Sequence, residues 1–526
     1  MHITLICADN ENWAIGLRSI SSVLKQAGHS TRIIMTCSGN GSLNARGLEC
    51  IRELSNGSSL IGISSMSRNS QKTKDIIGAL RPLGIPVVWG GMHPTLYPDD
   101  CVGHADLICR GEGEGFMVEL AERVAVGKGW LDLLSAGHRS DGRTVLNEVR
   151  PLFPDLDALP FVDFGFSDEF NVDDRGEVRS NAAMRNELSI LFTGSRGCAF
   201  NCHYCSNAQL KTLYAGKGRY IRKMSIPVFV ESARKCREIF PRAKYFYFTD
   251  EDFFARSVGE FREFAELYPK TVGLPFECMA SPQQISEEKM DLLVKAGLWR
   301  VDMGVESGSD RVKKEIFNRH GSNEIVMRSA AILARYPQVV VYYFFIIGNP
   351  YEERADLLGT VGLIQKLPYP SFVRTYNLVF MPGTHLFERA CRDGVINGIE
   401  DSGYELDFLA GFDYRGHAWK MNDLYLNGLL SLMTGKATRR RTGFIPRVIL
   451  PALIRPRWLD FNDRHLAISK SMVGVARAGL KLRRKVLILA SKVLKDPSTI
   501  YNPGGKAKKI LSNESNGRAA SAGSPD

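Results

Sequence analysis

The sequence predicts an α/β protein built from two parallel-sheet domains. Two observations carry this prediction: short apolar runs alternate with helical stretches along residues 1–135, and the alternation resumes at wider spacing from residue 188. Apolar runs of this length between helices are typical of parallel strands that helices cover on both faces. A length of 526 residues allows two to four domains of about 100–200 residues each. We therefore expect a Rossmann-like, doubly wound sheet, then a second α/β domain, then a region of different composition.

Five strands and four helices are predicted for the first domain, residues 1–135. The strands are expected at His2–Cys7, Thr31–Thr36, Leu60–Ser64, Val87–Trp89 and Asp106–Cys109, and the helices at 15–27, 44–54, 69–82 and 113–125. Ligands of such sheets bind beyond the carboxyl ends of the strands. Three successive strand ends carry small or polar residues, in the loops 64–67, 90–95 and 110–114. This favours a ligand crevice at that edge of the sheet.

A partial or full (β/α)6 barrel is predicted for residues 188–400. Its strands are expected at Leu188–Thr193, Tyr245–Thr249, Pro275–Ala280, Val301–Glu306, Val339–Ile347 and Thr375–Phe380, with helices such as 226–239, 258–267, 286–296 and 323–335 between them. The active site of such a barrel lies at the C-terminal strand ends, where most of the polar residues fall. Residues 136–187 are rich in Pro, Asp and Phe without periodicity, so we expect a linker held down by its aromatic side chains.

The chain changes character after residue 400. We expect a helical, basic region over 401–495 and disorder over 496–526, where Pro, Gly, Ser and Asn dominate. Residues 436–526 hold 20 Lys and Arg against 5 Asp and Glu, a net +15, so the rest of the chain carries −4 of the total +11. A mildly acidic body does not suit nucleic-acid binding. For segment 464–495 two interpretations stay open: a helical subdomain with a solvated cationic face, which we favour, or peripheral contact with an anionic membrane surface.

Cysteine usage and hydropathy predict a cytoplasmic protein. The start, MHITLICADNENW, lacks a basic region, so no secretory signal is expected. The longest apolar run, 339–347, is too short to span a bilayer, which takes about 20 residues. The 11 cysteines are scattered except for three. That pattern suits a reducing compartment with one group of metal ligands.

The strongest chemical signal is the segment GCAFNCHYC, in which Cys198, Cys202 and Cys205 follow the first barrel strand. Three thiolates at these spacings can converge on one metal centre from a single loop. A cubane iron–sulfur cluster normally takes four cysteines, one per iron, so three leave one iron open to an exogenous ligand. The alternatives are zinc, with His203 or a distant cysteine as fourth ligand, and plain structural thiols. Structural zinc sites usually show paired ligand motifs, and the sequence has no second one, so we favour the cluster.

This CxxxCxxC loop resembles that of the radical S-adenosylmethionine (SAM) enzymes, and the order of the domains resembles their cobalamin-binding branch, which includes the class B methyltransferases. The resemblance covers roughly residues 1–400. Its motifs are VVWGGMHPTLYPDD and ADLICRGEGEGF in the first domain, and GSRGCAFNCHYCSN, YFTDEDFF, RVDMGVESGSD, FFIIGNPYEE and MPGTHLFERA in the barrel. The cysteine motif is highly specific, the GG-x-H-P-T and G-E-G-E pair fairly specific, and the others are supportive.

The resemblance implies a [4Fe-4S] cluster on Cys198, Cys202 and Cys205 that binds SAM through its open iron and, with an electron from a donor such as flavodoxin or ferredoxin, cleaves it to a 5′-deoxyadenosyl radical. It also implies SAM ligands by position. These are Tyr204 along the adenine, Asp250 and Glu251 at the ammonium group, Glu306 at the ribose or methionine moiety, and Gly348, where the backbone approaches the adenine. For the acidic residues the alternative is a solvated loop carboxylate or a helix cap.

The first domain resembles a cobalamin module. Residues placed where the corrin ring and the nucleotide tail would lie are Ser64, Ser65, Gly90, Gly91 and His93. One departure is clear: many such modules carry a D-x-H-x-x-G motif that supplies a histidine to cobalt, whereas the loop 8–16 here contains no histidine. The lower cobalt face would lack that ligand, or the module has lost cobalamin. We interpret His93 as a supporting loop residue and not as the cobalt ligand.

The resemblance implies a cobalamin-dependent radical SAM methyltransferase that acts on a small-molecule or lipid-like substrate, most simply at an unactivated carbon. Methylcobalamin would hold the methyl group, and a second SAM would remethylate cobalt. A radical SAM cyclase or rearrangement enzyme without methyl transfer is the alternative within enzymes. A non-catalytic corrinoid- or zinc-binding protein is the alternative from another class, and the intact cysteine loop on a full barrel pattern argues against it.

Overall fold

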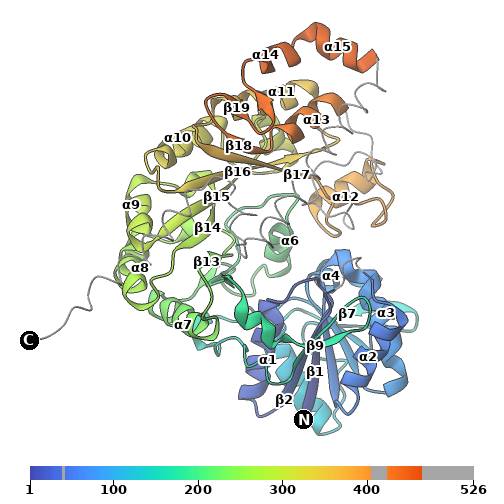
Figure 1. The fold of residues 1–526 in the computed structure, drawn as a ribbon. Helices are drawn as coiled ribbons and strands as arrows, with labels where there is room; N and C mark the ends of the chain where they lie inside the picture. The colour runs from blue at the N-terminus through green and yellow to red at the C-terminus, as the bar shows by residue number, and fades with distance from the viewer. Residues whose placement is uncertain (38–41, 404–422, 465–526) are drawn as a thin grey trace, which may run out of the picture.

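The computed structural model describes residues 1–37, 42–403 and 423–464. The described chain forms two nine-stranded sheets and one small two-stranded sheet. Figure 1 shows the first sheet and its helices at one end of the molecule and the barrel arching away from them. The expectations for residues 465–526, including the tail 496–526, lie outside the described residues.

The first sheet is a doubly wound parallel sheet, as predicted. Its central strands are β1 (His2–Cys7), β2 (Ser30–Met35), β3 (Leu60–Ser64), β4 (Val87–Gly90) and β5 (Leu107–Cys109), and its helices are α1 (Ile15–Gln26), α2 (Ala45–Ser55), α3 (Ser70–Leu80), α4 (Met92–Leu96) and α5 (Glu114–Ala125). The strands pair in parallel in the order β5-β4-β3-β1-β2. The five predicted strands and four predicted helices are confirmed to within three residues. Only the short helix α4 was not predicted.

Helices cover both faces of this sheet. On one face, Leu17 of α1 and Phe116 of α5 pack with Leu5. On the other, Ile51 of α2 and Ile76 of α3 pack in a second apolar cluster. Because both faces are buried, the strands read as continuous apolar runs and not as alternating ones.

The segment 136–187 is not the irregular linker that its composition indicated. It contributes four strands, β6 (Ala136–Ser140), β7 (Arg143–Leu146), β8 (Glu169–Val172) and β9 (Val178–Ser180), which extend the first sheet at both edges. These strands are short and partly exposed, so they carry neither an apolar run nor a clean alternation. The expected aromatic packing is confirmed: Phe164 contacts Trp13 and Phe240, with ring centroids 6.0 and 5.1 Å apart.

The second sheet is a partial (β/α)6 barrel, as predicted. Its parallel strands, in spatial order, are β10 (Ser189–Phe192), β13 (Tyr245–Phe248), β14 (Phe276–Ala280), β15 (Leu298–Glu306), β16 (Val340–Ile347) and β17 (Ser371–Asn377). The helices are α6 (Ser206–Leu213), α7 (Ile226–Ile239), α8 (Val258–Thr271), α9 (Glu287–Ala296), α10 (Asn323–Ala334), α11 (Arg354–Lys366) and α12 (His385–Arg392). A two-stranded ribbon, β11 (Ser195–Arg196) and β12 (Arg222–Lys223), flanks the cysteine loop.

The last barrel strand begins at Ser371 and not at Thr375, so its predicted position was wrong by four residues. The apolar residues Leu378 and Phe380, which suggested a later strand, pack instead with α12. The barrel is open among the described residues, because β10 and β17 do not pair with each other.

The described part of the C-terminal region, residues 423–464, contains short strands as well as helices, which corrects the expectation of an entirely helical structure there. The described part contains α13 (Leu424–Leu432), β18 (Gly435–Ala437), β19 (Arg441–Thr442), β20 (Ile445–Pro446), α14 (Leu450–Leu453) and α15 (Pro456–Arg464). Strand β18 pairs antiparallel with β17 and extends the barrel sheet, and Leu426 and Leu430 of α13 are buried in the barrel core. None of the described helices is long and apolar enough to cross a membrane.

Candidate active site between the two domains

A cavity of about 550 Å³ lies between the first domain and the barrel. Its first-domain wall comes from the carboxyl ends of β3 and β4, and its barrel wall from the residues that follow β10 and β13. The two domains also touch directly, since Tyr97 after α4 packs edge-on against Phe387 of α12, with ring centroids 6.0 Å apart. The strand ends of both sheets therefore face one space, as the positions of the sequence motifs indicated.

Three of the five candidate cobalamin residues, Ser64, Gly90 and Gly91, line this cavity. Gly91 has φ = 100° and lies so close to the preceding strand end that an added Cβ would come within 2.8 Å of the Ser65 carbonyl oxygen. Only glycine satisfies both conditions. Gly111 and Gly113 of the G-E-G-E loop also line the cavity. At these glycines the wall presents backbone to the cavity, which fits the close approach of a flat corrin ring.

The other two candidates, Ser65 and His93, are not among the residues that line the cavity, and both contact neighbouring side chains of the first domain. The Ser65 hydroxyl accepts a hydrogen bond from the Trp89 indole N–H at 2.9 Å. His93 is fully buried, and its two ring nitrogens lie 2.9 Å from Ser67 Oγ and 2.9 Å from Asp100 Oδ2. Both ring nitrogens of His93 are thus engaged by side chains of the first domain. The loop 8–16 contributes Ile15 and Gly16 to the cavity wall.

The cysteine loop follows β11 and lies beside the barrel wall of the cavity. Gly197, which precedes Cys198, has φ = 89°, and a Cβ there would collide with the backbone of Tyr220, so glycine sets the path of the loop. Cys202 is buried, while Cys198 and Cys205 are half-buried. Within the described residues no three His, Cys, Asp or Glu side chains converge as ligands of a single ion. A cubane places each thiolate on a separate iron.

The three thiols share one electrostatic environment. Burial raises the pKa of Cys198 to about 11, and the charge of Cys205 adds to that shift. Burial also raises the pKa of Cys205, with a further contribution from Cys202. Because a metal binds the thiolate form, cluster assembly on this loop must release protons.

Tyr204 and Glu306 meet at an arginine that the sequence did not single out. The Arg319 guanidinium lies 3.4 Å from the Tyr204 hydroxyl and 3.8 Å from Glu306 Oε1. Glu306 ends β15 with φ = 72°, a strained conformation for a side chain with a Cβ. Gly304 permits this arrangement, because a Cβ there would come within 2.6 Å of Glu306 Oε1. Burial raises the pKa of Glu306, and Arg319 opposes the rise.

The three acidic residues after β13 occupy different places. Asp250 is buried and accepts a hydrogen bond from the Gly194 N–H at 3.3 Å, so it supports the end of β10. Glu251 lines the cavity. Asp252 accepts a hydrogen bond from the Ser281 N–H at 3.4 Å, and burial raises the pKa of Asp252 to about 6.

One carboxylate oxygen of Asp250 and one of Asp252 have no hydrogen-bond partner in the described part of the chain. Buried polar atoms usually have partners, so each of these oxygens is free to accept a hydrogen bond that the described chain does not supply. Of the two residues predicted for the SAM ammonium group, Glu251 faces the cavity, and Asp250 directs one oxygen to the backbone.

Gly348 has φ = 75°, and its N–H donates to the Asn427 side chain of α13 at 2.7 Å. The loop after β16 is therefore held by the C-terminal region, and Gly348 is not among the residues that line the cavity of about 550 Å³.

Sequence reasoning missed the ion-pair network that joins the domains. Arg222 of β12 bonds to both carboxylate oxygens of Glu112, at 3.0 and 2.7 Å. Arg196, two residues before Cys198, pairs with Glu112 at 3.1 Å and with Glu114 at 2.5 Å. The two glutamates of the G-E-G-E motif thus hold the arginines that flank the cysteine loop. The available signal was the pair of alternating glutamates in the first-domain motif together with the arginine that precedes the cysteine loop in the SRGC motif.

Both domains match models of known protein families. Residues 1–121 match the model of the B12 binding domain, and residues 192–363 match that of the Radical SAM superfamily. The chain is 24% identical over 331 residues to cytidylyl-2-hydroxyethylphosphonate methyltransferase of Streptomyces wedmorensis, a match that covers 56% of this chain and 58% of that protein. It is 25% identical over 324 residues to an uncharacterized methyltransferase of Pyrococcus horikoshii, with 59% and 64% covered. The matches thus span less than two thirds of either relative.

Solved structures show the same fold. The radical SAM methyltransferase TsrM from Kitasatospora setae, with cobalamin and a [4Fe-4S] cluster bound, superposes with a TM-score of 0.60 at 16% identity and covers 91% of this chain and 99% of that one. The cobalamin-dependent radical enzyme OxsB gives a TM-score of 0.61 at 14% identity, with 99% and 80% covered.

The two matched domains identify SAM with a [4Fe-4S] cluster and cobalamin as the cofactors, and the cysteine loop and the glycine-lined wall are the parts of this chain that fit them. The chain thus carries a B12 binding domain followed by a radical SAM domain, which is the order of domains that the sequence motifs indicated.

Proposed function

We propose that the protein is a cobalamin-dependent radical SAM methyltransferase that acts on a small molecule, most simply at an unactivated carbon. One observation carries the proposal: the glycine-lined wall of the first domain and Glu251, beside the cysteine loop, face one cavity. A methyl group held at the first domain and a radical generated at the barrel must meet at one substrate. A shared cavity allows that meeting without domain movement.

The chain's own residues have distinct tasks in this proposal. Cys198, Cys202 and Cys205 would hold the cluster, and Glu251 and Asp252 supply carboxylates for the ammonium group of SAM. When bound, the cofactors supply the one-electron and methyl-group chemistry, while the protein orients them and excludes competing reactions. The cavity wall is mainly apolar, with residues such as Leu5, Leu17 and Met117 of the first domain behind its glycines. An apolar wall keeps water from a reactive intermediate.

The names of the relatives support methyl transfer to small molecules. Besides the phosphonate methyltransferase, the chain is 22% identical over 337 residues to a bacteriochlorophyllide d C-12(1)-methyltransferase of Chlorobaculum tepidum. A nucleotide-linked phosphonate and a tetrapyrrole have little chemistry in common. What the relatives share is the methyl transfer, so we assign the reaction type and leave the substrate at the level of a small or lipid-like molecule. A flavodoxin- or ferredoxin-type protein is the electron donor that we propose.

Anaerobic reconstitution with iron, sulfide and cobalamin, followed by reduction with methyl-labelled SAM, tests the proposal. We expect deoxyadenosine, S-adenosylhomocysteine and, with substrate, a labelled product. Cys202→Ala should abolish all three. Cys236→Ala changes a buried cysteine of α7 in the barrel core, outside the cysteine loop; it is the matched control and should retain them. Deoxyadenosine without S-adenosylhomocysteine would favour cyclisation or rearrangement. Neither product, or full activity in Cys202→Ala, would reject a radical SAM enzyme.

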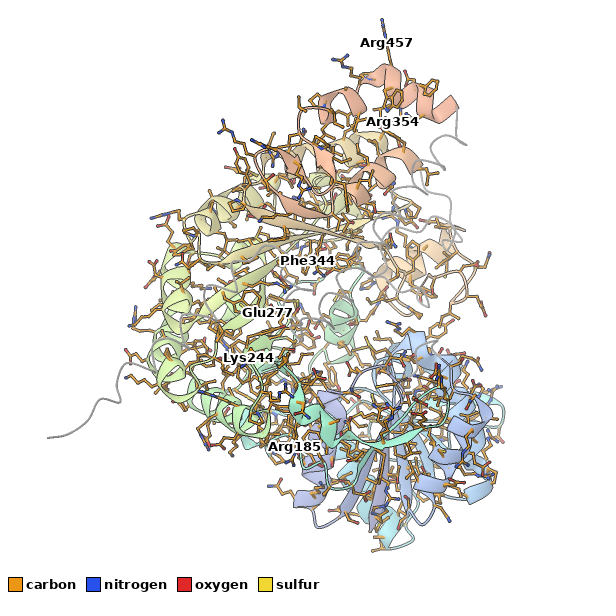
Figure 2. All side chains as sticks on the ribbon, viewed as in Figure 1. Arg185, Lys244, Glu277, Phe344, Arg354 and Arg457 are labelled. Atoms are coloured by element: carbon orange, nitrogen blue, oxygen red, sulfur yellow. The ribbon has the colours of Figure 1, made fainter. Side chains whose placement is uncertain are left out.

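We also propose that the basic C-terminal region contacts an anionic membrane surface. Residues 439–457 form a surface, here termed the arginine hairpin, with Arg439, Arg440, Arg441, Arg455 and Arg457 exposed. Figure 2 shows the Arg457 side chain directed away from the protein at its outer end. Between these cations Phe444, Val448 and Ile449 are 41%, 84% and 44% exposed. Exposed apolar side chains among arginines, with no acidic residue in 439–457, suit a lipid surface better than a nucleic acid.

A further inference from the structure

Arg319 reaches the cysteine loop from the segment that follows β15. A single π turn, Val312–Ile316, precedes it, and Asn318 adopts φ = 47°. The Arg319 N–H donates to the Lys313 carbonyl at 2.7 Å, which fixes the backbone from which the side chain extends. The side chain is only 11% exposed, so its charge acts in a poorly hydrated environment.

The guanidinium contacts a cluster-ligand sulfur. Its Nη1 lies 3.6 Å from Cys202 Sγ, within hydrogen-bond range for sulfur, and its Nη2 donates to the Gly304 carbonyl at 2.9 Å. The guanidinium also lies over the Phe200 ring, 5.6 Å from its centroid. A carbonyl, an aromatic ring and the Glu306 carboxylate thus hold the planar group with one N–H edge toward Cys202.

We propose that Arg319 is a positioning residue that donates to the Cys202 thiolate and raises the reduction potential of the cluster. The inference rests on the proposed function, since it assumes a cluster on the three cysteines. Reduction adds negative charge to a cluster, and hydrogen bonds to its sulfurs set how easily that charge is accepted. A cationic donor binds an anionic acceptor about twice as strongly as a neutral donor does. Arg319 should therefore stabilise the reduced state more than the oxidised state.

Asn207 offers an internal comparison. Its side-chain N–H₂ lies 3.7 Å from Cys205 Sγ, and its carbonyl oxygen accepts from the Tyr220 hydroxyl at 2.7 Å. Asn207 is thus a neutral donor held toward a second sulfur of the same loop. The charge argument predicts a smaller change in potential for Asn207→Ala than for Arg319→Met.

A purely structural role for Arg319 makes a different prediction. If Arg319 only holds the Gly304 carbonyl and Glu306, its loss would lower stability and leave the cluster potential unchanged. A role in binding SAM would likewise leave the potential unchanged when SAM is absent. Lys211 is the matched control, because it is a cation of α6 whose Nζ reaches the cysteine loop at the Ala199 and Phe200 carbonyls, each at 3.1 Å, and contacts no sulfur among the described residues.

The test is a redox titration of the full-length, anaerobically reconstituted protein without SAM, followed by electron paramagnetic resonance. At the wild-type midpoint we expect the ratio of reduced to oxidised cluster to fall about tenfold in Arg319→Met, equal to about 59 mV for one electron. Arg319→Lys should fall less, and Lys211→Met should stay near the wild-type ratio. An unchanged ratio in Arg319→Met with full iron content would overturn the inference. If Arg319→Met does not hold a cluster, an unchanged ratio in Arg319→Lys would overturn it.

This readout also separates the inference from the proposed function. A wild-type protein that assembles no cluster would refute the proposed function, and the inference with it. A wild-type protein that assembles the cluster and cleaves SAM, with an unmoved potential in the arginine variants, would refute the inference alone.

Discussion

Arg222 and Glu112 join the barrel to the first domain through two parallel hydrogen bonds, of 3.0 and 2.7 Å. Arg222 is nearly fully buried, and its partner strand, β11, carries Arg196, which pairs with the same glutamate. The cysteine loop begins two residues later. The position of the cluster relative to the first domain therefore depends on charges at the domain interface.

Removal of the Glu112 charge should destabilise the protein strongly. Glu112→Gln removes the charge that faces the buried Arg222, while Arg196 keeps its pair with Glu114, and breaking a buried pair in this way costs up to about 3–5 kcal/mol. Glu119→Gln is the matched control, because its pairs with Arg123 and Arg150 are more exposed, and less than about 1 kcal/mol is expected. Denaturant unfolding measures both. Equal losses in the two variants would contradict the assignment of Glu112 as the interface clamp.

The same pair predicts a pH dependence. Burial alone would raise the pKa of Glu112, but hydrogen bonds from Arg222 and the charge of Arg196 hold it below its usual 4.5. Because the pKa of Glu112 is lower in the folded chain, the unfolded chain binds the Glu112 proton more tightly. The stabilisation that the Glu112 carboxylate contributes is therefore full above pH 4.5 and is lost as the pH falls through the folded-state pKa. Glu112→Gln should flatten the acid limb of a stability–pH profile. An unchanged acid limb would show that another group controls it.

Asp252 should show the opposite dependence. Burial raises the pKa of Asp252 from 3.8 to about 6, so the folded chain binds this proton more tightly than the unfolded chain. The free energy of unfolding then falls as the pH rises between these two values. Asp252→Asn removes that loss and should stabilise the cofactor-free protein at pH 7 by up to about 3 kcal/mol, while weakening SAM binding. Unfolding curves and SAM titrations check both effects, and a less stable variant at pH 7 would refute the prediction.

Alanine substitutions at Gly91 and Gly78 should have opposite effects on the stability of the protein. A Cβ at Gly91 would come within 2.8 Å of a backbone oxygen at φ = 100°, whereas Gly78 in α3 has nothing within 4 Å. Gly91→Ala is expected to destabilise the protein and weaken cobalamin binding. Gly78→Ala should stabilise by about 0.5–1 kcal/mol without affecting cobalamin. Thermal unfolding and a cobalamin absorbance titration measure both, and normal cobalamin binding by Gly91→Ala would remove this wall from the proposed corrin site.

Membrane contact is tested by flotation of the full chain with vesicles. We expect recovery with anionic vesicles and little with neutral ones, and Val448→Asp should reduce recovery because it places a charge at the most exposed apolar position of the arginine hairpin. Val178→Asp, at an exposed valine of β9, is the control. A chain ending at residue 464 that floats as well as the full chain would assign the contact to the arginine hairpin. Equal recovery of Val448→Asp and wild type would reject that surface.

The sequence predicted the fold where burial leaves a strong pattern. The central strands of both sheets are covered on both faces, so each appears as an apolar run. The edge strands β6 to β9 and β18 to β20 were missed because they are short and half-exposed, and their pairing is decided by neighbours and not by local composition.

The candidate site divides in the same way. The three cysteines were recognisable because all lie in one loop, where spacing alone carries the information. The Glu112–Arg222 and Glu114–Arg196 pairs join residues 110 and 82 positions apart, and no local pattern records such a contact. The sequence could not show that the Ser65 and His93 side chains contact neighbours within the first domain, because a loop motif does not record which of its side chains turn inward.

We expect the cluster and cobalamin to share one cavity, and the magnetic interaction between them tests this most directly. The reduced cluster and cob(II)alamin are both paramagnetic, so the protein loaded with both should show a broadened, fast-relaxing cob(II)alamin signal in electron paramagnetic resonance. Cys202→Ala loaded with cobalamin alone should show the unperturbed signal. A doubly loaded wild-type spectrum equal to the sum of the two separate signals would contradict the account.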